Sequence, residues 1–101
     1  MNYGKGGCVY ILTNKFNKLL YTGVTSDLYS RMVQHREKHF SNSFTSKYNC
    51  SKLVYFLPFH SIEEAIAEEK RLKAGNRLQK IKLIQELNPQ WNDLWDEVKN
   101  W

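Results

Sequence analysis

The chain has 101 residues, of which 15 are Lys or Arg and 10 are Asp or Glu, giving a formal net charge of +5. This length suits one compact domain, residues 1–101, and is too short for two. The charge favours a polyanionic partner such as nucleic acid, although many soluble domains carry a similar charge without one. No apolar run is long enough for a secretory signal or a membrane span, so we expect a cytoplasmic protein with no membrane partner.

The first half of the chain predicts a β-hairpin followed by a helix. Segments 8–13 and 19–25 are rich in β-branched and aromatic residues and flank a polar stretch. Residues 25–27 then supply side-chain oxygens that cap a helix ending at about Arg36. The segment 37–49 is expected to be a long loop, and long loops in small domains often carry function.

The second half predicts one more strand and three helices. Segment 52–57 is typical of a strand, which we expect to stop at Pro58. Ser61 and Glu64 have the spacing of a capping box, and this box begins a helix that ends at Gly75. A further helix is expected over 77–87, and a short one over about 93–98. Apolar residues at three-residue spacing on the helix 77–87 are Leu78, Ile81, Ile84 and Leu87. The last helix is expected to bury Trp91, Leu94 and Trp95. The predicted fold is mixed α+β, with a small three-stranded antiparallel-type sheet flanked by helices.

Two polar residues lie together on the first predicted helix. On a helical wheel its apolar arc comprises Leu28, Tyr29, Met32 and Val33. Arg31 and His35 are four residues apart and stack at the edge of this arc, so both side chains can act at one site. The alternatives are a solvated surface cation at Arg31 and a hydrogen-bonded boundary histidine at His35.

The helix that begins near Ser61 carries one carboxylate on its apolar side. Its predicted buried arc comprises Ile62, Ala65, Ile66 and Leu72. Glu69 falls inside this arc, whereas Glu68 is expected on the solvent side of the same turn. Burying an unpaired carboxylate costs several kcal/mol, so Glu69 should bind a metal ion or pair with a cation such as Arg31.

Two tyrosines and a run of basic residues complete the candidate set. Tyr10 and Tyr21 lie on adjacent predicted strands, either as a cross-strand aromatic pair or as the lining of a polar site where Gly23 permits close approach. The basic run comprises Lys70, Arg71, Lys73, Arg77, Lys80 and Lys82, and Lys47 and Lys52 would extend it. Such a run is either a solvated face or a phosphate-contacting surface.

The order of these residues along the chain resembles the order found in the GIY-YIG nuclease superfamily. Its two signature motifs align with 8–10 and 21–23, which places Tyr10 and Tyr21 eleven positions apart. Arg31 and His35 match the positions of the family's helix residues, and Glu69 matches its metal-binding glutamate. Segments 23–28, 44–48 and 88–94 resemble small stand-alone bacterial members, a group similar to the N-terminal nuclease domain of the excinuclease C subunit. Two departures are Cys8, where the first motif has glycine, and Thr22, where the second has an apolar residue.

The resemblance implies a divalent-metal-dependent endonuclease that hydrolyses DNA phosphodiester bonds, directed by DNA structure in repair or recombination. Glu69 would hold Mg²⁺ or Mn²⁺, and Arg31 would grip the scissile phosphate. Tyr10 and Tyr21 would position or deprotonate the attacking water, with support from His35. The residues expected to contact the substrate are Gly23, Lys47, Lys73, Arg77 and Asn88. RNA stays open as a partner, and the sequence does not set the oligomeric state.

Two rival classes of function remain. A non-cleaving nucleic-acid-binding module needs only basic charge and aromatic side chains. A zinc-stabilised interaction domain would use Cys8, Cys50, His35 and His39, but these lack the paired C-x-x-C spacing that is common in such sites. Outside a metal site, the two cysteines are expected to be small buried thiols.

Overall fold

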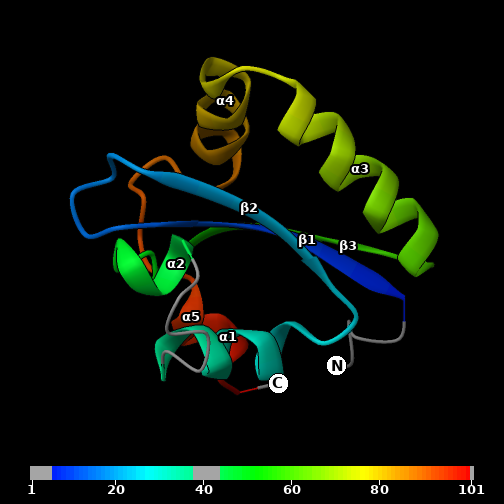
Figure 1. Cartoon of the computed structure of the whole chain (residues 1–101), viewed down its shortest axis with the longest axis horizontal. Coiled ribbons are helices and arrows are strands. Elements are labelled where there is room, and N and C mark those ends of the chain that lie inside the picture. Colours follow the sequence, from blue (N-terminus) through cyan, green and yellow to red (C-terminus); the bar gives the residue numbers. More distant parts are fainter. Residues whose placement is uncertain (1–5, 38–43, 101) are drawn as a thin grey trace.

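An antiparallel sheet separates two layers of helices in the computed structural model, which describes residues 6–37 and 44–100 (Figure 1). The elements in chain order are β1 (Gly7–Thr13), β2 (Leu20–Thr25), α1 (Leu28–Arg36), α2 (Phe44–Lys47), β3 (Lys52–Phe59), α3 (Ile62–Ala74), α4 (Arg77–Leu87) and α5 (Trp95–Val98). The predicted fold class, a three-stranded antiparallel sheet with flanking helices, is confirmed.

The strand order is β2-β1-β3, so β1 is central and the other two strands form the edges of the sheet. Every residue of β1 is buried, as expected for a strand covered on both faces. The register sets Tyr10 opposite Gly23 and Leu12 opposite Tyr21. Because directly opposed residues share a face, both tyrosines lie on the same side of the sheet.

Alternate residues of β1 face two separate cores. The core on the side of α1 and α5 contains Cys8, Tyr10, Leu12, Leu28, Met32 and Val98. The side of α3 and α4 buries Val9, Ile11, Ala65, Leu72 and Ile84. Figure 1 shows the same arrangement, with α3 and α4 above the sheet and α1 and α5 below it. The sheet therefore divides the two helices that carry the candidate residues, α1 and α3.

The starts of three helices follow from local capping chemistry. The Asp27 carboxylate accepts the backbone N–H of Ser30, and the Ser61 hydroxyl accepts that of Glu64, at 3.1 and 3.2 Å. The Glu64 carboxylate also accepts from the Ser61 hydroxyl at 3.0 Å. The two residues are therefore paired as expected, but the donor to Glu64 is the Ser61 side chain and not the Ser61 backbone N–H of a complete capping box. Helix α4 begins with a complete capping box between Asn76 and Gln79, which the sequence interpretation missed.

Three element boundaries differ from the prediction. The segment expected to be a long loop contains the short helix α2, while residues 38–43 lie outside the described part of the chain. Strand β3 continues through Pro58 to Phe59, because an edge strand tolerates a residue without an N–H. Helix α5 begins at Trp95, two residues later than expected.

Fewer apolar residues of the C-terminal half are buried than the sequence pattern predicted. Ile84 is fully buried, whereas Leu78 and Leu87 are 74% and 53% exposed. A three-residue spacing drifts by about 60° per step around a helix, so the ends of the series leave the buried face. Trp91 and Trp95 were expected to be largely buried, but both are only half-buried against the core clusters.

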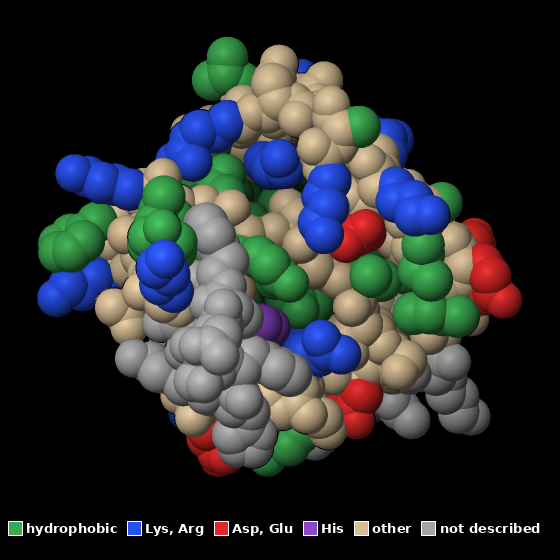
Figure 2. All heavy atoms as spheres, in the orientation of Figure 1, with side chains coloured by type: hydrophobic (Ala, Val, Ile, Leu, Met, Phe, Trp, Pro, Cys, Tyr) green, Lys and Arg blue, Asp and Glu red, His purple; other side chains and the backbone are tan. Residues whose placement is uncertain are grey.

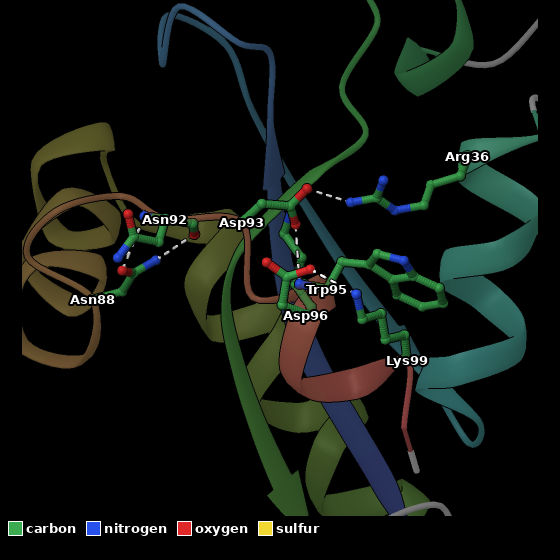
Figure 3. Close-up of polar contacts among 8 residues, drawn as sticks. Arg36, Asn88, Asn92, Asp93, Trp95, Asp96 and Lys99 are labelled. Carbon is green, nitrogen blue, oxygen red and sulfur yellow. Dashed lines mark hydrogen bonds and ion pairs between the residues drawn. The ribbon is translucent and has the colours of Figure 1, made fainter.

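The C-terminal segment is held to the sheet through Asp93 (Figure 3). Its carboxylate forms an ion pair with Arg36 of α1 and accepts the backbone N–H groups of Leu53 and Trp95 at 3.2 and 3.0 Å. The carboxylate thus joins α1, β3 and the start of α5, and so fixes the helix that carries Arg31 and His35.

Candidate functional site

A chain of hydrogen bonds links β1, α1 and α2. The Tyr10 hydroxyl lies 3.1 Å from His35 Nε2, and His35 Nδ1 lies 3.0 Å from Thr45 Oγ1. All three side chains are buried, with 1%, 7% and 4% of the residue exposed. Thr45 thereby fixes the ring orientation of His35, and His35 is the direct partner of a tyrosine from the first signature motif.

The two tyrosines and His35 form one aromatic cluster. The Tyr10 and Tyr21 ring centroids are 6.4 Å apart, and each lies 5.9 Å from the His35 centroid. Gly23 makes this packing possible, because a Cβ atom there would lie 2.4 Å from both Cζ and the hydroxyl oxygen of Tyr10. The close approach expected at Gly23 is therefore made by Tyr10 itself.

Burial and the Arg31 charge set the protonation states in this cluster. Burial, with the nearby Arg31 cation, lowers the pKa of His35 to about 4. Burial and the neighbouring Tyr21 raise the pKa of Tyr10, and a hydrogen bond and positive charge from Arg31 only partly oppose this. At neutral pH His35 is a neutral imidazole and Tyr10 a protonated phenol. In the tautomer in which Nδ1 donates to Thr45, Nε2 accepts the Tyr10 proton.

Glu69 lies on α3, in the opposite helical layer, where Lys73 is its ion partner. Lys73 Nζ is 2.8 Å from Glu69 Oε2, and the carboxylate side chain is 13% exposed. The sequence predicted Arg31 as an alternative cation partner of Glu69, and that prediction is wrong. The helical wheel placed Glu69 correctly toward the protein.

The wheel was wrong about the neighbouring carboxylate, Glu68. Its side chain is only 18% exposed, and the Arg71 guanidinium holds it through two hydrogen bonds of 2.7 and 2.6 Å. This pairing lowers the pKa of Glu68. Burial, and to a smaller extent the Glu68 charge, raise the pKa of Tyr55 on β3. Glu68 and Glu69 are thus both ion-paired, to different cations.

The donor chemistry at Glu69 fits a hard divalent cation that keeps most of its waters. Mg²⁺ is commonly bound by one or two carboxylates together with water and substrate phosphate. Within residues 6–37 and 44–100, no three His, Cys, Asp or Glu side chains gather as a metal-binding group. Cys8, Cys50 and His35 therefore do not form the zinc site considered above. The fourth residue of that site, His39, lies outside the described residues.

A basic pocket at the outer edge of β2 connects the two helical layers. This cavity of about 340 Å³ is lined by Leu20, Tyr21, Thr22, Lys73 and Lys80. Tyr21 also belongs to the aromatic cluster, and Lys73 is the partner of Glu69, so the pocket adjoins both halves of the candidate site. On the face that Figure 2 shows, Lys and Arg side chains gather over the side of the molecule where α3 and α4 lie. Of the candidate site residues, Tyr21 and Lys73 thus meet at this edge of the sheet.

The remaining candidate residues are placed differently. Arg77 reaches from α4 to the β1–β2 hairpin, where its Nη2 donates to Asn17 O at 3.4 Å. Lys47 is exposed on α2, with its ammonium 5.7 Å from the Tyr48 ring centroid. Neither contact joins these two residues to the aromatic cluster.

Asn88 is buried and bonded to backbone groups. Its Nδ2 donates to Val54 O and Asn92 O at 3.2 and 2.8 Å, and its Oδ1 accepts Asn92 N–H at 3.0 Å (Figure 3). These contacts give Asn88 a structural role at the turn after α4. Its substrate contact stays a prediction, and these bonds do not support it.

Sequence interpretation missed Thr45 and the pocket residues Thr22 and Lys80. Thr45 comes from the segment expected to be a loop, and its spacing from His35 carries no periodic signal. Thr22 had been noted only as a departure from the motif, and Lys80 only as one member of the basic run. Their significance depends on tertiary placement.

An antiparallel sheet with a tyrosine on each of two adjacent strands, an Arg/His helix and a glutamate-bearing helix defines a nuclease-type domain. The family model described as the GIY-YIG catalytic domain matches residues 6–82, and the chain belongs to the GIY-YIG family. It is 30% identical over 82 residues to a UPF0213 protein of Syntrophus aciditrophicus, covering 81% of this chain and 92% of that protein. It is 36% identical over 78 residues to a UPF0213 protein of Staphylococcus haemolyticus, covering 77% and 93%.

No solved structure gives a significant match to the chain. None of the described helices is long and apolar enough to cross a membrane. The relatives are small stand-alone members of the family, whereas the likeness to the excinuclease C subunit stays a prediction.

Proposed function

We propose that the protein is a divalent-metal-dependent endonuclease that hydrolyses DNA phosphodiester bonds in branched or otherwise structured DNA, as in repair or recombination. The observation that carries the proposal is the hydrogen-bond chain from Tyr10 through His35 to Thr45 beside Arg31. Burial, and to a smaller extent the Arg31 cation, lower the pKa of His35, and a titratable group perturbed by a specific charge partner is typical of a functional site.

Hydrolysis requires a proton acceptor for the attacking water. The raised pKa of Tyr10 disfavours a preformed phenolate. The geometry suits a relay: the water gives a proton to the Tyr10 oxygen as the Tyr10 proton moves to His35 Nε2. The new bond joins the water oxygen to phosphorus, and the bond from phosphorus to the leaving oxygen breaks, with the electron pair going to that oxygen, which takes a proton from solvent water. His35 Nε2 is the accepting nitrogen when His35 Nδ1 donates to Thr45 Oγ1.

The negative charge that develops on the phosphate needs fixed positive groups. Arg31 offers a planar fork of N–H donors that matches two phosphate oxygens. A phosphate bound to Arg31 would offset the charge that lowers the pKa of His35, so substrate binding would make His35 a better proton acceptor. Glu69 would hold Mg²⁺ or Mn²⁺, which when bound supplies Lewis-acid stabilisation of the phosphate charge.

Cleavage of labelled oligonucleotides tests the proposal. Single-stranded, duplex, flap and branched DNA, and RNA of the same sequences, are incubated with the protein and Mg²⁺, Mn²⁺ or EDTA. We expect divalent-dependent cleavage of at least one DNA substrate, and loss of that cleavage in the Glu69→Gln variant. Binding of all substrates without cleavage in either metal would instead support a non-cleaving nucleic-acid-binding module, which the basic pocket alone would explain.

A further inference from the structure

The Thr22 hydroxyl is a buried polar group without a hydrogen-bond partner. Thr22 is 5% exposed, and its Oγ1 is unpaired within the part of the chain that the structure describes. It lies opposite Ile11 on the face of β2 that α3 and α4 cover. An unsatisfied buried hydroxyl costs about 1–3 kcal/mol, which an apolar residue of the same shape would avoid.

The surroundings of Thr22 indicate which ligand would satisfy it. Its side chain lines the basic pocket together with Lys73 and Lys80, and no acidic residue is among the described lining residues. Lysine ammonium groups bind phosphate as point charges, and a threonine hydroxyl donates to phosphate oxygen. Threonine has staggered positions about its Cα–Cβ bond, so its hydroxyl can turn to an oxygen that enters the pocket. The pocket is shallow and open to solvent, so a phosphate group of a nucleic acid can approach it from outside.

We propose that this pocket binds a second, non-scissile phosphate group of the nucleic acid, held by the Thr22 hydroxyl and the Lys73 and Lys80 ammonium groups. The inference rests on the proposed function and names a substrate contact for it. Tyr21 and Lys73 belong to both the pocket and the cleavage site, so a phosphate bound here is a near neighbour of the scissile one. Its binding would set which phosphodiester bond reaches Arg31.

The neighbouring carboxylate makes this binding depend on cations. Lys73 is engaged with Glu69 at 2.8 Å, and the Glu69 charge opposes an anion in the pocket. A divalent cation at Glu69 would remove that opposition and release Lys73 toward the phosphate. Phosphate binding in the pocket should therefore strengthen when Mg²⁺ is added, by the reciprocity of coupled binding.

The test is an NMR titration of the full chain, first in EDTA so that no cleavage occurs. The ligands are inorganic phosphate, a short single-stranded DNA without terminal phosphates, and the same DNA with a 5′-phosphate. We expect shifts at Thr22, Lys73 and Lys80. Thr22→Val should weaken binding about tenfold, because a hydrogen bond to a charged group is lost. Thr22→Ser should retain the affinity. A Thr22-dependent effect on the unphosphorylated DNA assigns the pocket to an internal phosphate, and an effect only with the 5′-phosphate assigns it to a strand end.

Two controls keep the test decisive. Lys80→Gln should weaken binding several-fold, whereas Lys99→Gln removes the same charge from the other helical layer, where Lys99 pairs with Asp96, and should have little effect. Thr22→Val should also raise the melting temperature, since it removes an unpaired hydroxyl. If the melting temperature rises and the affinity for all three ligands is unchanged, Thr22 contacts no phosphate and the inference is wrong.

Failure of the inference and failure of the proposed function give different results. Thr22-dependent binding in EDTA, without cleavage of any substrate in Mg²⁺ or Mn²⁺, would overturn the endonuclease proposal and leave the phosphate pocket standing. Normal metal-dependent cleavage by Thr22→Val, with unchanged affinity and unchanged cleavage positions, would overturn the pocket and leave the endonuclease standing.

Discussion

Lys73 Nζ lies 2.8 Å from Glu69 Oε2, so the carboxylate proposed to bind a metal ion is neutralised by a lysine of its own helix. The two residues are separated by one helical turn, the spacing at which oppositely charged side chains meet. A divalent cation must displace the Lys73 ammonium or bind beside it against its repulsion. Lys73 is therefore a competitor for the metal as well as a candidate phosphate contact.

Replacing Lys73 with glutamine should strengthen metal binding and weaken DNA binding. Removal of the ammonium frees the Glu69 carboxylate, so we expect Mn²⁺ affinity to rise several-fold, measured by electron paramagnetic resonance of free Mn²⁺. The double variant with Glu69→Gln should lose the gain. If Lys73→Gln binds Mn²⁺ no more tightly than the wild type, Glu69 is not the metal ligand.

The Glu69→Gln substitution should separate binding from cleavage. It keeps the shape of the side chain and removes the charge that a divalent cation requires. We expect cleavage to fall by about a hundredfold or more, while DNA affinity is kept or rises, because Lys73 is freed and the Glu69 charge no longer opposes a bound phosphate. Single-turnover cleavage and fluorescence anisotropy measure the two quantities.

Two further glutamates on α3 provide controls for that experiment. Glu63 is exposed in the first turn, so Glu63→Gln removes the same charge far from the pocket and should be nearly silent. Glu68→Gln breaks the pairing with the exposed Arg71 and should lower stability only slightly, without a metal-specific defect. If Glu69→Gln lowers stability and leaves cleavage intact, the only role of Glu69 is its ion pair with Lys73.

The lowered pKa of His35 makes stability depend on pH. Its pKa falls from an ordinary 6.5 to about 4 in the folded protein, so its contribution to stability is complete above pH 6.5. As the pH falls toward 4, the unfolded chain binds a proton that folded His35 rejects. The free energy of unfolding should then decrease by up to about 1.4 kcal/mol per pH unit. Urea denaturation between pH 4 and pH 7 measures this slope. His35→Gln should reduce it, and equal slopes in both proteins would show that His35 is not the titrating group.

Gly23→Ala should displace Tyr10. The new Cβ would lie 2.4 Å from Tyr10 Cζ, so we expect a loss of about 1–3 kcal/mol of stability and weaker cleavage. Thermal unfolding of a double-mutant cycle with Tyr10→Leu checks the cause, because removing the ring also removes the clash. The two losses should therefore add to more than the loss in the double variant. If the two losses of stability simply add in the double variant, the effect of Gly23→Ala does not come from contact with Tyr10.

DNA affinity should fall steeply with salt. Each phosphate contact contributes a slope of about −0.9 in the logarithm of affinity against the logarithm of salt concentration on duplex DNA. Charge reversal at Arg77 or Lys80 should flatten this slope, since both extend from α4 toward the edge of β2. Anisotropy titrations at several salt concentrations test this. An affinity that is the same at low and high salt would identify the basic run as a solvated surface.

The features that the sequence predicted well depend on local chemistry. Asp27 and Ser61 cap helices through residues three positions later, and Gly75 ends α3, so each boundary is encoded within one turn. The pairing of the first two strands follows from the short polar stretch between them. Glu69 was placed toward the protein because the helical period fixes that direction.

The features that the sequence did not predict depend on tertiary distances. The partner of Glu69 was expected to be Arg31, on another helix, although Lys73 stands at the favourable four-residue spacing. Thr45 meets His35 only because the chain returns after α1 and forms α2. The Thr22 hydroxyl is unpaired because the described residues that bury it offer it no hydrogen-bond partner, and no residue pattern along the chain predicts this.

The two edges of the sheet are protected by different means. At the start of β3, Leu94 N–H bonds to Leu53 O at 2.7 Å and Asn88 bonds to Val54 O, so other parts of the chain cover this end of the strand. Along β2, the neighbours are the side chains of Lys73 and Lys80. Lysines beside an edge strand discourage a second chain from adding to the sheet. The positive charge proposed to attract DNA would therefore also keep the protein soluble. Chemical neutralisation of these lysines, for example by acetylation, would leave the β2 edge open to self-association.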